Sequence, residues 1–223
     1  KPKAKYNIVN DLDSDVFNLF NVVMNQKEEL ETAFYMMPIH SDLLEYWKKN
    51  QEAEPIKKAL RFLFLSNWTF LGAGSSTYFG AGGKYTTKDN FFKEIDICFK
   101  SLYDTQFNNV DFHKFLNNIS FHKDGRNDEK KTLIYCDPPY LGTDDNYSNS
   151  FTEEQSKELF DTLEETGCKF AISEFDQPFI LEQAKQRDLN VIIIGERNNL
   201  KNRRTEILVT NYSNSQQSLF NGG

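Results

Sequence analysis

The second half of the sequence predicts an α/β fold with a mostly parallel sheet, and two observations carry the prediction. Short apolar runs typical of strands alternate there with amphipathic segments at helical spacing, as expected for strands joined by crossover helices. Thr152 and Gln155 have the spacing of a capping box, which marks the start of a helix. We expect strands at 132–136, 168–173, 191–194 and 206–212, and helices at 152–165 and 177–187.

The first half is mainly helical, apart from one short strand expected at 6–10. Ser14 is expected to cap the first helix, because apolar residues recur at helical spacing after it. Residues 71–83 contain five of the eleven glycines, which favours a loop or loose hairpin. Further helices are expected at about 28–36, 41–49, 56–68 and 88–102, and the third of these is apolar nearly all round, which predicts a buried helix.

The composition limits the class of protein. A chain of 223 residues with 39% hydrophobic content suits one globular domain with a small insertion. No apolar run approaches the ~20 residues of a membrane span, and no signal peptide is visible, so we expect no membrane partner. The three cysteines lack metal-ligand spacing, which predicts reduced thiols in a cytoplasmic protein without a metal site. The net charge of −7 argues mildly against a nucleic-acid partner unless basic residues cluster locally.

The most informative motif is Asp137-Pro138-Pro139-Tyr140, which directly follows the apolar run 133–136. Ligands of open α/β sheets bind outside the carboxyl ends of the strands, where this tetrapeptide falls. The two prolines fix φ and cannot donate hydrogen bonds, so the segment is a stiff group of acceptors beside an aromatic ring.

That arrangement suits an exocyclic amine such as N6 of adenine. If the Asp137 carboxylate and the Pro138 carbonyl accept the two amino protons, the nitrogen becomes more pyramidal and more nucleophilic. Tyr140 can stack on a base flipped out of the duplex. Positioning for in-line attack on a methyl group then does most of the catalysis, without a covalent intermediate. The alternative is a proline-rich turn with no catalytic role.

With its flanking segments, the tetrapeptide resembles the Dam-type DNA adenine-N6 methyltransferases, in which the cofactor motif comes first, the target-recognition region next and Asp-Pro-Pro-Tyr last. The resemblance spans most of the chain. The other segments that carry it are 11–15, 149–152 with Gln155, 171–173 with Asp176, 204–208 and 211–212.

The resemblance implies a Rossmann-like fold that uses S-adenosyl-L-methionine. Asp11 would bind the ribose hydroxyls, since a carboxylate after a strand suits a diol. Asp111 and Phe112 resemble the segment that lines the cofactor adenine, and Asp137 would also border the cofactor. The alternative is that Asp11 and its acidic neighbours only solvate a turn, and that Asp111 and Phe112 have no binding role.

The resemblance also implies a double-stranded DNA partner. Residues 67–90 occupy the place of the family's recognition hairpin and include Lys84, Tyr85 and Lys88, although a flexible loop is an equally good interpretation. A second basic cluster, Lys201, Arg203 and Arg204, is expected to contact phosphates, or else to be a charged turn without a role. We expect a catalytic domain of residues 1–25 and 104–223, with a helical target-recognition insertion at 26–103.

One family motif is missing, the Phe-x-Gly-x-Gly loop that cradles the methionine part of the cofactor. The glycines at 72–83 neither follow a strand nor open a helix, so they fail its context test. Its expected place is about ten residues before Lys1. We therefore expect an N-terminal segment, on this or another polypeptide, to complete the cofactor site.

Three functions remain open from the sequence. The first is adenine-N6 methylation of duplex DNA. The second is a DNA-binding subunit that binds no cofactor by itself. The third is cytosine-N4 methylation, which Asp137 disfavours because relatives acting on that amine tend to carry Ser there. The target sequence, the oligomeric state and the biological role, such as restriction-modification, stay open.

Overall fold

The structure, a computed structural model, describes residues 4–68, 88–123, 126–142, 151–198 and 203–213. The chain divides into two compact units, an N-terminal unit of Lys1–Phe115 and a C-terminal unit of Leu116–Gly223. Each is described by itself below.

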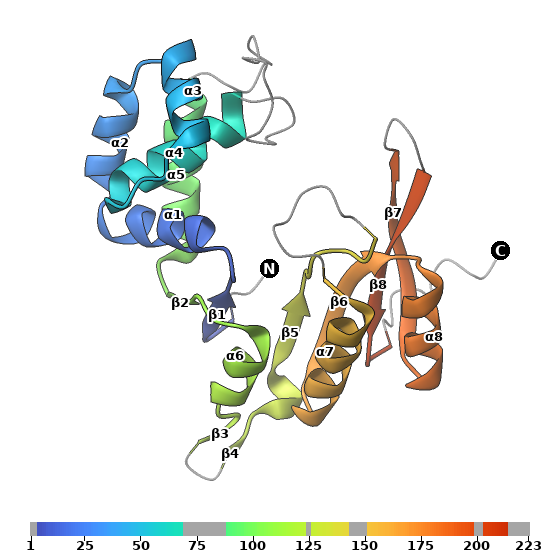
Figure 1. Cartoon of the computed structure of the whole chain (residues 1–223). Helices are drawn as coiled ribbons and strands as arrows, with labels where there is room; N and C mark the ends of the chain where they lie inside the picture. Colours follow the sequence, from blue (N-terminus) through green and yellow to red (C-terminus); the bar gives the residue numbers. More distant parts are fainter. Residues whose placement is uncertain (1–3, 69–87, 124–125, 143–150, 199–202, 214–223) are drawn as a thin grey trace, which may run out of the picture. The chain divides into compact units, whose positions relative to one another are not determined.

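The N-terminal unit is dominated by five helices around one aromatic core (Figure 1). They are α1 (Ser14–Asn25), α2 (Lys27–Met36), α3 (Ser41–Lys49), α4 (Pro55–Trp68) and α5 (Lys88–Leu102). Phe34 lies at the centre, 1% exposed, with its ring stacked on Phe91 and tilted against Trp68. The predicted helices therefore exist, and α3 and α5 have the predicted bounds.

The start of α1 differs from the prediction. Asp13 rather than Ser14 is the N-cap, because the Asp13 side chain accepts hydrogen bonds from the backbone N–H groups of Asp15 and Val16. Both residue types are good caps, and the sequence alone does not decide between neighbours. Asp15 in turn pairs with Lys58 and Arg61 of α4, at 3.1 Å and 3.4 Å, which ties the first turn of α1 to that helix.

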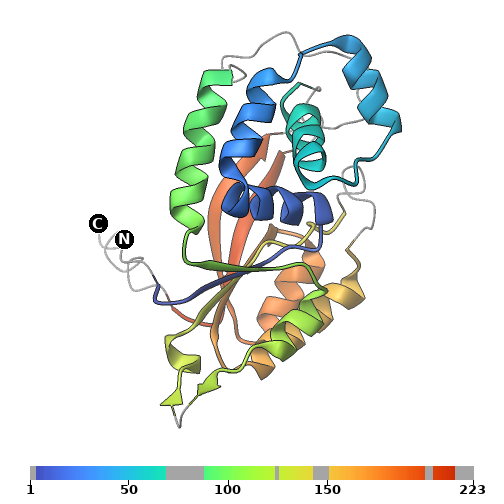
Figure 2. The ribbon, with the colours of Figure 1, turned by 90° about the vertical axis from the view of Figure 1, so that its left-hand side faces the viewer.

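Two short strands complete the unit, β1 (Asn7–Asn10) and β2 (Thr105–Asn108), followed by α6 (Phe112–Asn118). The strands pair in parallel from Asn7 with Thr105 to Asn10 with Asn108, and Figure 2 shows them side by side. The sequence did not predict β2 or α6, because a polar four-residue strand and a seven-residue helix leave little periodicity to detect.

The C-terminal unit contains a four-stranded sheet with two helices. The strands are β5 (Leu133–Cys136), β6 (Lys169–Phe175), β7 (Asn190–Asn198) and β8 (Arg203–Thr210), and the helices are α7 (Glu153–Glu165) and α8 (Pro178–Gln186). A two-stranded pair, β3 (His122–Lys123) and β4 (Arg126–Asn127), precedes a 3-10 turn at Glu129–Lys131. The predicted capping box at α7 is confirmed, since Thr152 and Gln155 bond each other's backbone N–H.

The expectation of a mostly parallel sheet is only partly correct, since the sheet is mixed. Its order is β5-β6-β8-β7, with β5 parallel to β6 and β8 antiparallel to both of its neighbours. The physical reason is the short connection between β7 and β8, because only residues 199–202 separate them. So short a connection joins antiparallel strands, whereas a parallel crossover needs a dozen residues or more.

Candidate active site

The tetrapeptide Asp137–Tyr140 directly follows β5, as predicted from the sequence. The neighbouring strand β6 pairs with β5 up to Cys136 opposite Ile172 and then continues for three residues, Ser173 to Phe175. That extension runs past the end of β5. It therefore supplies side chains to the segment where the tetrapeptide lies.

Asp137 is held by a side chain of β6. The Ser173 hydroxyl donates to Asp137 Oδ1 at 2.7 Å, and the Tyr135 hydroxyl donates to Ser173 Oγ at 3.2 Å. Ser173 is 1% exposed, whereas Asp137 itself is exposed. A buried hydroxyl thus orients a carboxylate that is open to solvent.

Tyr140 is fixed at both ends. Its hydroxyl donates to Glu206 Oε1 on β8 at 2.9 Å, and its ring meets the edge of Phe175 at 4.7 Å between centroids and 87° between planes. Phe175 and Glu206 are opposite each other in the β6–β8 register, so their side chains share one face of the sheet. Burial, the hydrogen bond to Glu206 and the nearby Asp137 charge raise the pKa of Tyr140, which keeps the phenol neutral.

The chain after Tyr140 is anchored by three further side chains. The Leu141 N–H donates to Glu174 Oε1 at 3.0 Å, Gln177 Nε2 donates to the Leu141 carbonyl at 3.4 Å, and Arg204 donates to the Gly142 carbonyl at 3.3 Å. Gly142 has φ of +71°, a left-handed conformation that favours glycine. Residues 143–150, which follow, lie outside the described part of the chain.

Sequence reasoning gave no role to Glu174, Phe175 or Glu206. A signal existed for the first of these, because Ser173 and Glu174 are polar residues inside a strand whose neighbours Phe170 to Ile172 are all buried and apolar. Buried polar groups are hydrogen-bonded as a rule, and such an interruption of an apolar strand marks partners that the sequence alone does not identify.

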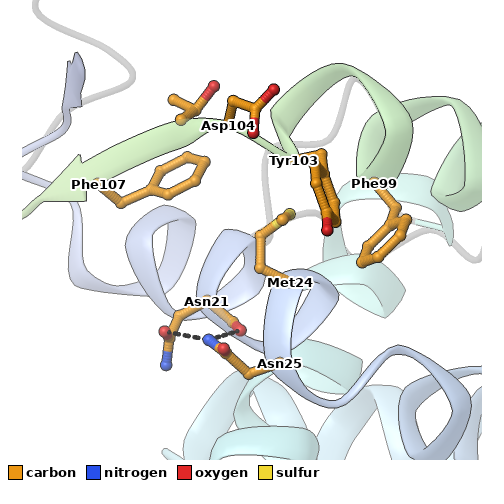
Figure 3. A pocket seen from close by; sticks show the side chains of 8 residues that line it. Asn21, Met24, Asn25, Phe99, Tyr103, Asp104 and Phe107 are labelled. Carbon is orange, nitrogen blue, oxygen red and sulfur yellow. Dashed lines mark hydrogen bonds between the residues drawn. The ribbon is translucent and has the colours of Figure 1, made fainter. Parts of the chain in front are cut away.

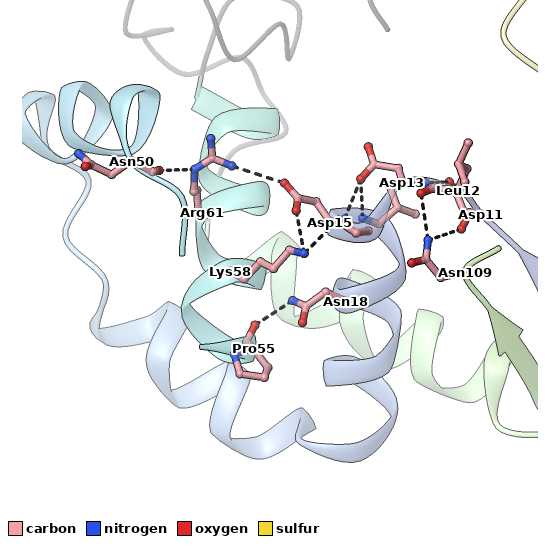
Figure 4. Close-up of polar contacts among 12 residues, drawn as sticks. Asp11, Leu12, Asp13, Asp15, Asn18, Asn50, Pro55, Lys58, Arg61 and Asn109 are labelled. Atoms are coloured by element: carbon pink, nitrogen blue, oxygen red, sulfur yellow. Dashed lines mark hydrogen bonds and ion pairs between the residues drawn. The ribbon is translucent and has the colours of Figure 1, made fainter. Parts of the chain in front are cut away.

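The second group of predicted residues lies at the carboxyl ends of β1 and β2. The Asn10 side chain bonds both the N–H and the C=O of Val110, at 3.1 Å and 2.9 Å, and Asn109 Nδ2 donates to the Asp11 carbonyl at 2.7 Å (Figure 4 shows the contacts of Asn109). Parallel pairing therefore brings Asp11 close to the segment that contains Asp111.

The carboxylates of this group make local bonds. Asp11 Oδ1 accepts from the N–H of Asp13 at 2.8 Å, and Asp111 Oδ1 accepts from the N–H of His113 at 2.9 Å. The Phe112 ring stacks on the His113 ring at 3.9 Å between centroids. The carboxylates of Asp11 and Asp111 and the ring of Phe112 therefore follow the ends of the two paired strands, β1 and β2.

Most of the predicted DNA-contacting side chains fall outside the described part of the chain. Lys84, Tyr85 and Lys201 lie outside the described residues, and so do the side chains of Lys88 and Arg203, which begin α5 and β8. Arg204 is described. Its guanidinium lies 5.2 Å from the centre of the Phe175 ring, so it packs beside the tetrapeptide's own support.

One surface pocket of the N-terminal unit involves none of the predicted site residues (Figure 3). It lies between α1, α5 and β2, and its polar lining includes Asn25, whose amide donates to Asn21 Oδ1 at 2.9 Å. Nothing in its lining indicates a chemical role.

A comparison with known protein families decides the class of this protein. Residues 1–198 match the family model of the D12 class N6 adenine-specific DNA methyltransferases. The chain belongs to this family. No curated protein is similar enough to this chain to match it. The protein is therefore a DNA adenine-N6 methyltransferase, and the resemblance based on the tetrapeptide is confirmed.

The family membership also bears on the open alternatives. The methyltransferase is assigned to adenine N6 and not to cytosine N4, and its substrate is DNA. The match gives no support to a complementing chain. Among the described helices, none has both the length and the apolar character needed to cross a membrane.

Proposed function

We propose that this enzyme takes the methyl group of S-adenosyl-L-methionine and transfers it to N6 of an adenine flipped out of duplex DNA. The observation that carries the proposal is the fixed geometry of the tetrapeptide. Asp137 is exposed but oriented by Ser173, and Tyr140 is fixed by Glu206 and Phe175. A base taken out of its stack can be read at its amino edge by such acceptors and stacked on such a ring.

The amino group would donate to Asp137 and to the Pro138 carbonyl. Proline lacks an N–H, so the backbone here presents a carbonyl without a competing donor. Two accepted hydrogen bonds draw the N6 lone pair out of the ring and direct it at an incoming methyl group. As the new N–C bond forms, the nitrogen loses one proton. The Asp137 carboxylate would take this proton or pass it to water.

The residues at the ends of β1 and β2 fit the adenosine part of the cofactor. Asp11 would accept hydrogen bonds from the ribose hydroxyls, and Asp111 with Phe112 would border the adenine. Asp137 would border the reacting end. When bound, the cofactor would supply an electrophilic methyl group from its sulfonium, and the electron pair of the broken S–C bond would stay on sulfur as a neutral thioether. The protein's own contribution is to bind and orient the two substrates and to exclude water around the reacting atoms.

The DNA contacts remain proposals drawn from the sequence. Basic side chains at a DNA surface neutralise phosphates and set the register of the duplex without reading bases. We assign this role to Lys201, Arg203 and Arg204, and we propose that Lys84, Tyr85 and Lys88 contact DNA as part of the recognition hairpin. Residues 26–103 would form the target-recognition insertion and the remainder the catalytic domain, although α1 (Ser14–Asn25) packs against α4 within the helical core.

The test is a methyl-transfer assay with the full chain. Tritiated S-adenosylmethionine and unmethylated genomic duplex DNA are incubated with the enzyme, and the nucleosides are then separated. We expect label in N6-methyl-2′-deoxyadenosine, with no label after Asp137→Ala. Label in cytosine, or in protein, would refute the proposed base chemistry. Calorimetry with S-adenosylmethionine tests the proposed cofactor separately. Absence of binding would contradict the proposal that this enzyme uses S-adenosylmethionine.

A further inference from the structure

We propose that Glu174 is a positioning residue for the methyl-transfer reaction, and that its ionised carboxylate holds Tyr140 in place by bonding two backbone N–H groups at once. The inference rests on the proposed role of Tyr140 as the surface on which the target base stacks. Glu174 touches neither Asp137 nor Tyr140 through a hydrogen bond in the described residues. It acts on Tyr140 through the backbone of Leu141 and Phe175.

The position of Glu174 is unusual for a charged side chain. It is 1% exposed, in a strand where every residue from Phe170 to Phe175 is buried. Removing a carboxylate from water is very unfavourable unless hydrogen bonds replace the lost hydration. An apolar side chain at position 174 would avoid this cost, so the retained carboxylate calls for a specific role.

Its hydrogen bonds indicate what the role is. Oε1 accepts from the N–H of Leu141 at 3.0 Å, and Oε2 accepts from the N–H of Phe175 at 2.8 Å. Leu141 is the residue directly after Tyr140, and Phe175 is the ring that packs edge-on against Tyr140. One carboxylate therefore holds both the backbone directly after Tyr140 and the backbone of Phe175, whose ring packs against Tyr140.

Both oxygens must act as acceptors for this arrangement. A protonated carboxyl group has one hydroxyl, whose oxygen is a weaker acceptor than a carboxylate oxygen, so protonation would weaken the bond to one of the two N–H groups. A glutamine has the same defect, because its amide nitrogen replaces one acceptor oxygen. The arrangement therefore depends on the charge of Glu174 and not only on its size.

The protonation equilibrium of Glu174 lies in the working range of an enzyme. Burial raises the pKa of Glu174 to about 7, assisted by the negative charge of Asp137 and opposed by the two backbone hydrogen bonds. The adjacent strand β8 contributes two further charged groups near this end of the sheet, Glu206 opposite Phe175 and Arg204 two residues earlier. Tyr140 stays neutral there because its own pKa is raised.

The experiment compares the wild type with Glu174→Gln under saturating substrates, from pH 6 to pH 8. We expect the wild-type kcat to rise about tenfold over this range as the carboxylate ionises. For Glu174→Gln we expect a kcat about 100-fold lower at pH 8, since small misplacements at a reacting centre have effects of this size. The KM for S-adenosylmethionine should be unchanged, and the remaining activity should lack the ionisation near neutral pH.

Two control variants separate the possible outcomes. Glu165→Gln removes an exposed carboxylate of the same unit and should match the wild type. Glu174→Asp keeps the charge but is one methylene shorter, so it should retain the ionisation with a reduced kcat. If Glu174→Gln does not fold, the wild type and Glu174→Asp decide alone, and a kcat independent of pH in both would overturn the inference.

The two proposals fail differently. Wild-type kcat and an unchanged pH profile in Glu174→Gln would overturn the positioning role of Glu174. If Asp137→Ala is inactive in the same assay, the proposed chemistry of the tetrapeptide survives that result. If Asp137→Ala instead stays active, the proposed function itself is wrong, whatever Glu174 does.

Discussion

The two groups of predicted site residues are held in different ways. Around the tetrapeptide, side-chain hydrogen bonds join residues 33 to 66 positions apart, from Leu141 with Glu174 to Tyr140 with Glu206. At the ends of β1 and β2, the carboxylates of Asp11 and Asp111 bond backbone N–H groups two residues ahead. The side chains of the first group are fixed by the sheet, whereas the two carboxylates of the second group are held by local turns.

The difference indicates how each group is expected to respond to substitution. A side chain fixed by distant partners is preorganised, so losing one partner changes the geometry of the reacting atoms. A carboxylate in a local turn keeps its place when a neighbour changes, and its value lies in what it binds. We therefore expect changes near the tetrapeptide to lower kcat, and changes at Asp11 to raise the KM for the cofactor.

The largest effect is expected for Asp137→Ala. The substitution removes the acceptor that orients the amino group, and a single preorganised group of this kind is worth about 1000-fold in kcat. Because Asp137 is exposed, the free energy of unfolding should change little. Methyl transfer and urea unfolding measured on the same sample check both statements. An active variant would contradict the assignment of Asp137.

The sequence was informative about this region only in part. The tetrapeptide and its place after a strand could be predicted, because proline and aspartate after an apolar run form a local pattern. Its partners Ser173, Glu174 and Glu206 could not, because they come from strands whose register is set by tertiary pairing. The same limit applies to β2, whose pairing with β1 depends on residues about a hundred positions apart.

A pH-dependent stability difference is expected next, for Glu174→Gln. The pKa of Glu174 is raised from 4.5 to about 7 in the folded state, so the folded state holds the proton more tightly than the unfolded state. The tighter binding of this proton adds to the free energy of unfolding. This contribution is fully present below pH 4.5 and is lost as the pH rises through 7. The glutamine does not titrate.

Relative to the wild type, the free energy of unfolding of Glu174→Gln should therefore rise by about 3 kcal/mol between these limits. Urea unfolding at a series of pH values measures the difference. The exposed Glu165→Gln variant should show no such trend. A difference that is constant with pH would mean that Glu174 has an ordinary pKa.

A smaller effect is expected for Ser173→Ala. The change removes the hydroxyl that donates to Asp137 at 2.7 Å, so the carboxylate can rotate away from the amino group. We expect kcat to fall about 10- to 100-fold with little change in the KM for DNA. Tyr135→Phe, which removes only the bond to Ser173, is the matched control and should have a weaker effect. Equal kcat in Ser173→Ala and the wild type would show that Asp137 needs no orienting partner.

Asp11→Ala tests the other side of the comparison. Loss of the ribose-binding carboxylate should weaken binding of S-adenosylmethionine about tenfold, the size of one hydrogen bond to a charged group. The kcat at saturating cofactor should stay near that of the wild type. Asp13→Ala is the control, because it removes the helix cap and should lower stability instead. A fall in kcat without a change in cofactor affinity would place Asp11 among the groups that act on the reaction itself.

The smallest effect is expected for Tyr140→Phe, which separates the two contacts of Tyr140. The ring that stacks on the base and packs on Phe175 is kept, and the hydroxyl is lost together with its 2.9 Å bond to Glu206. A single hydrogen bond is worth about 1 kcal/mol, so kcat should fall about fivefold. Tyr140→Ala removes the ring as well and should have a much larger effect. If the two variants were equally impaired, the hydroxyl and not the aromatic face would be the functional part of Tyr140, and base stacking would have to be assigned to another side chain.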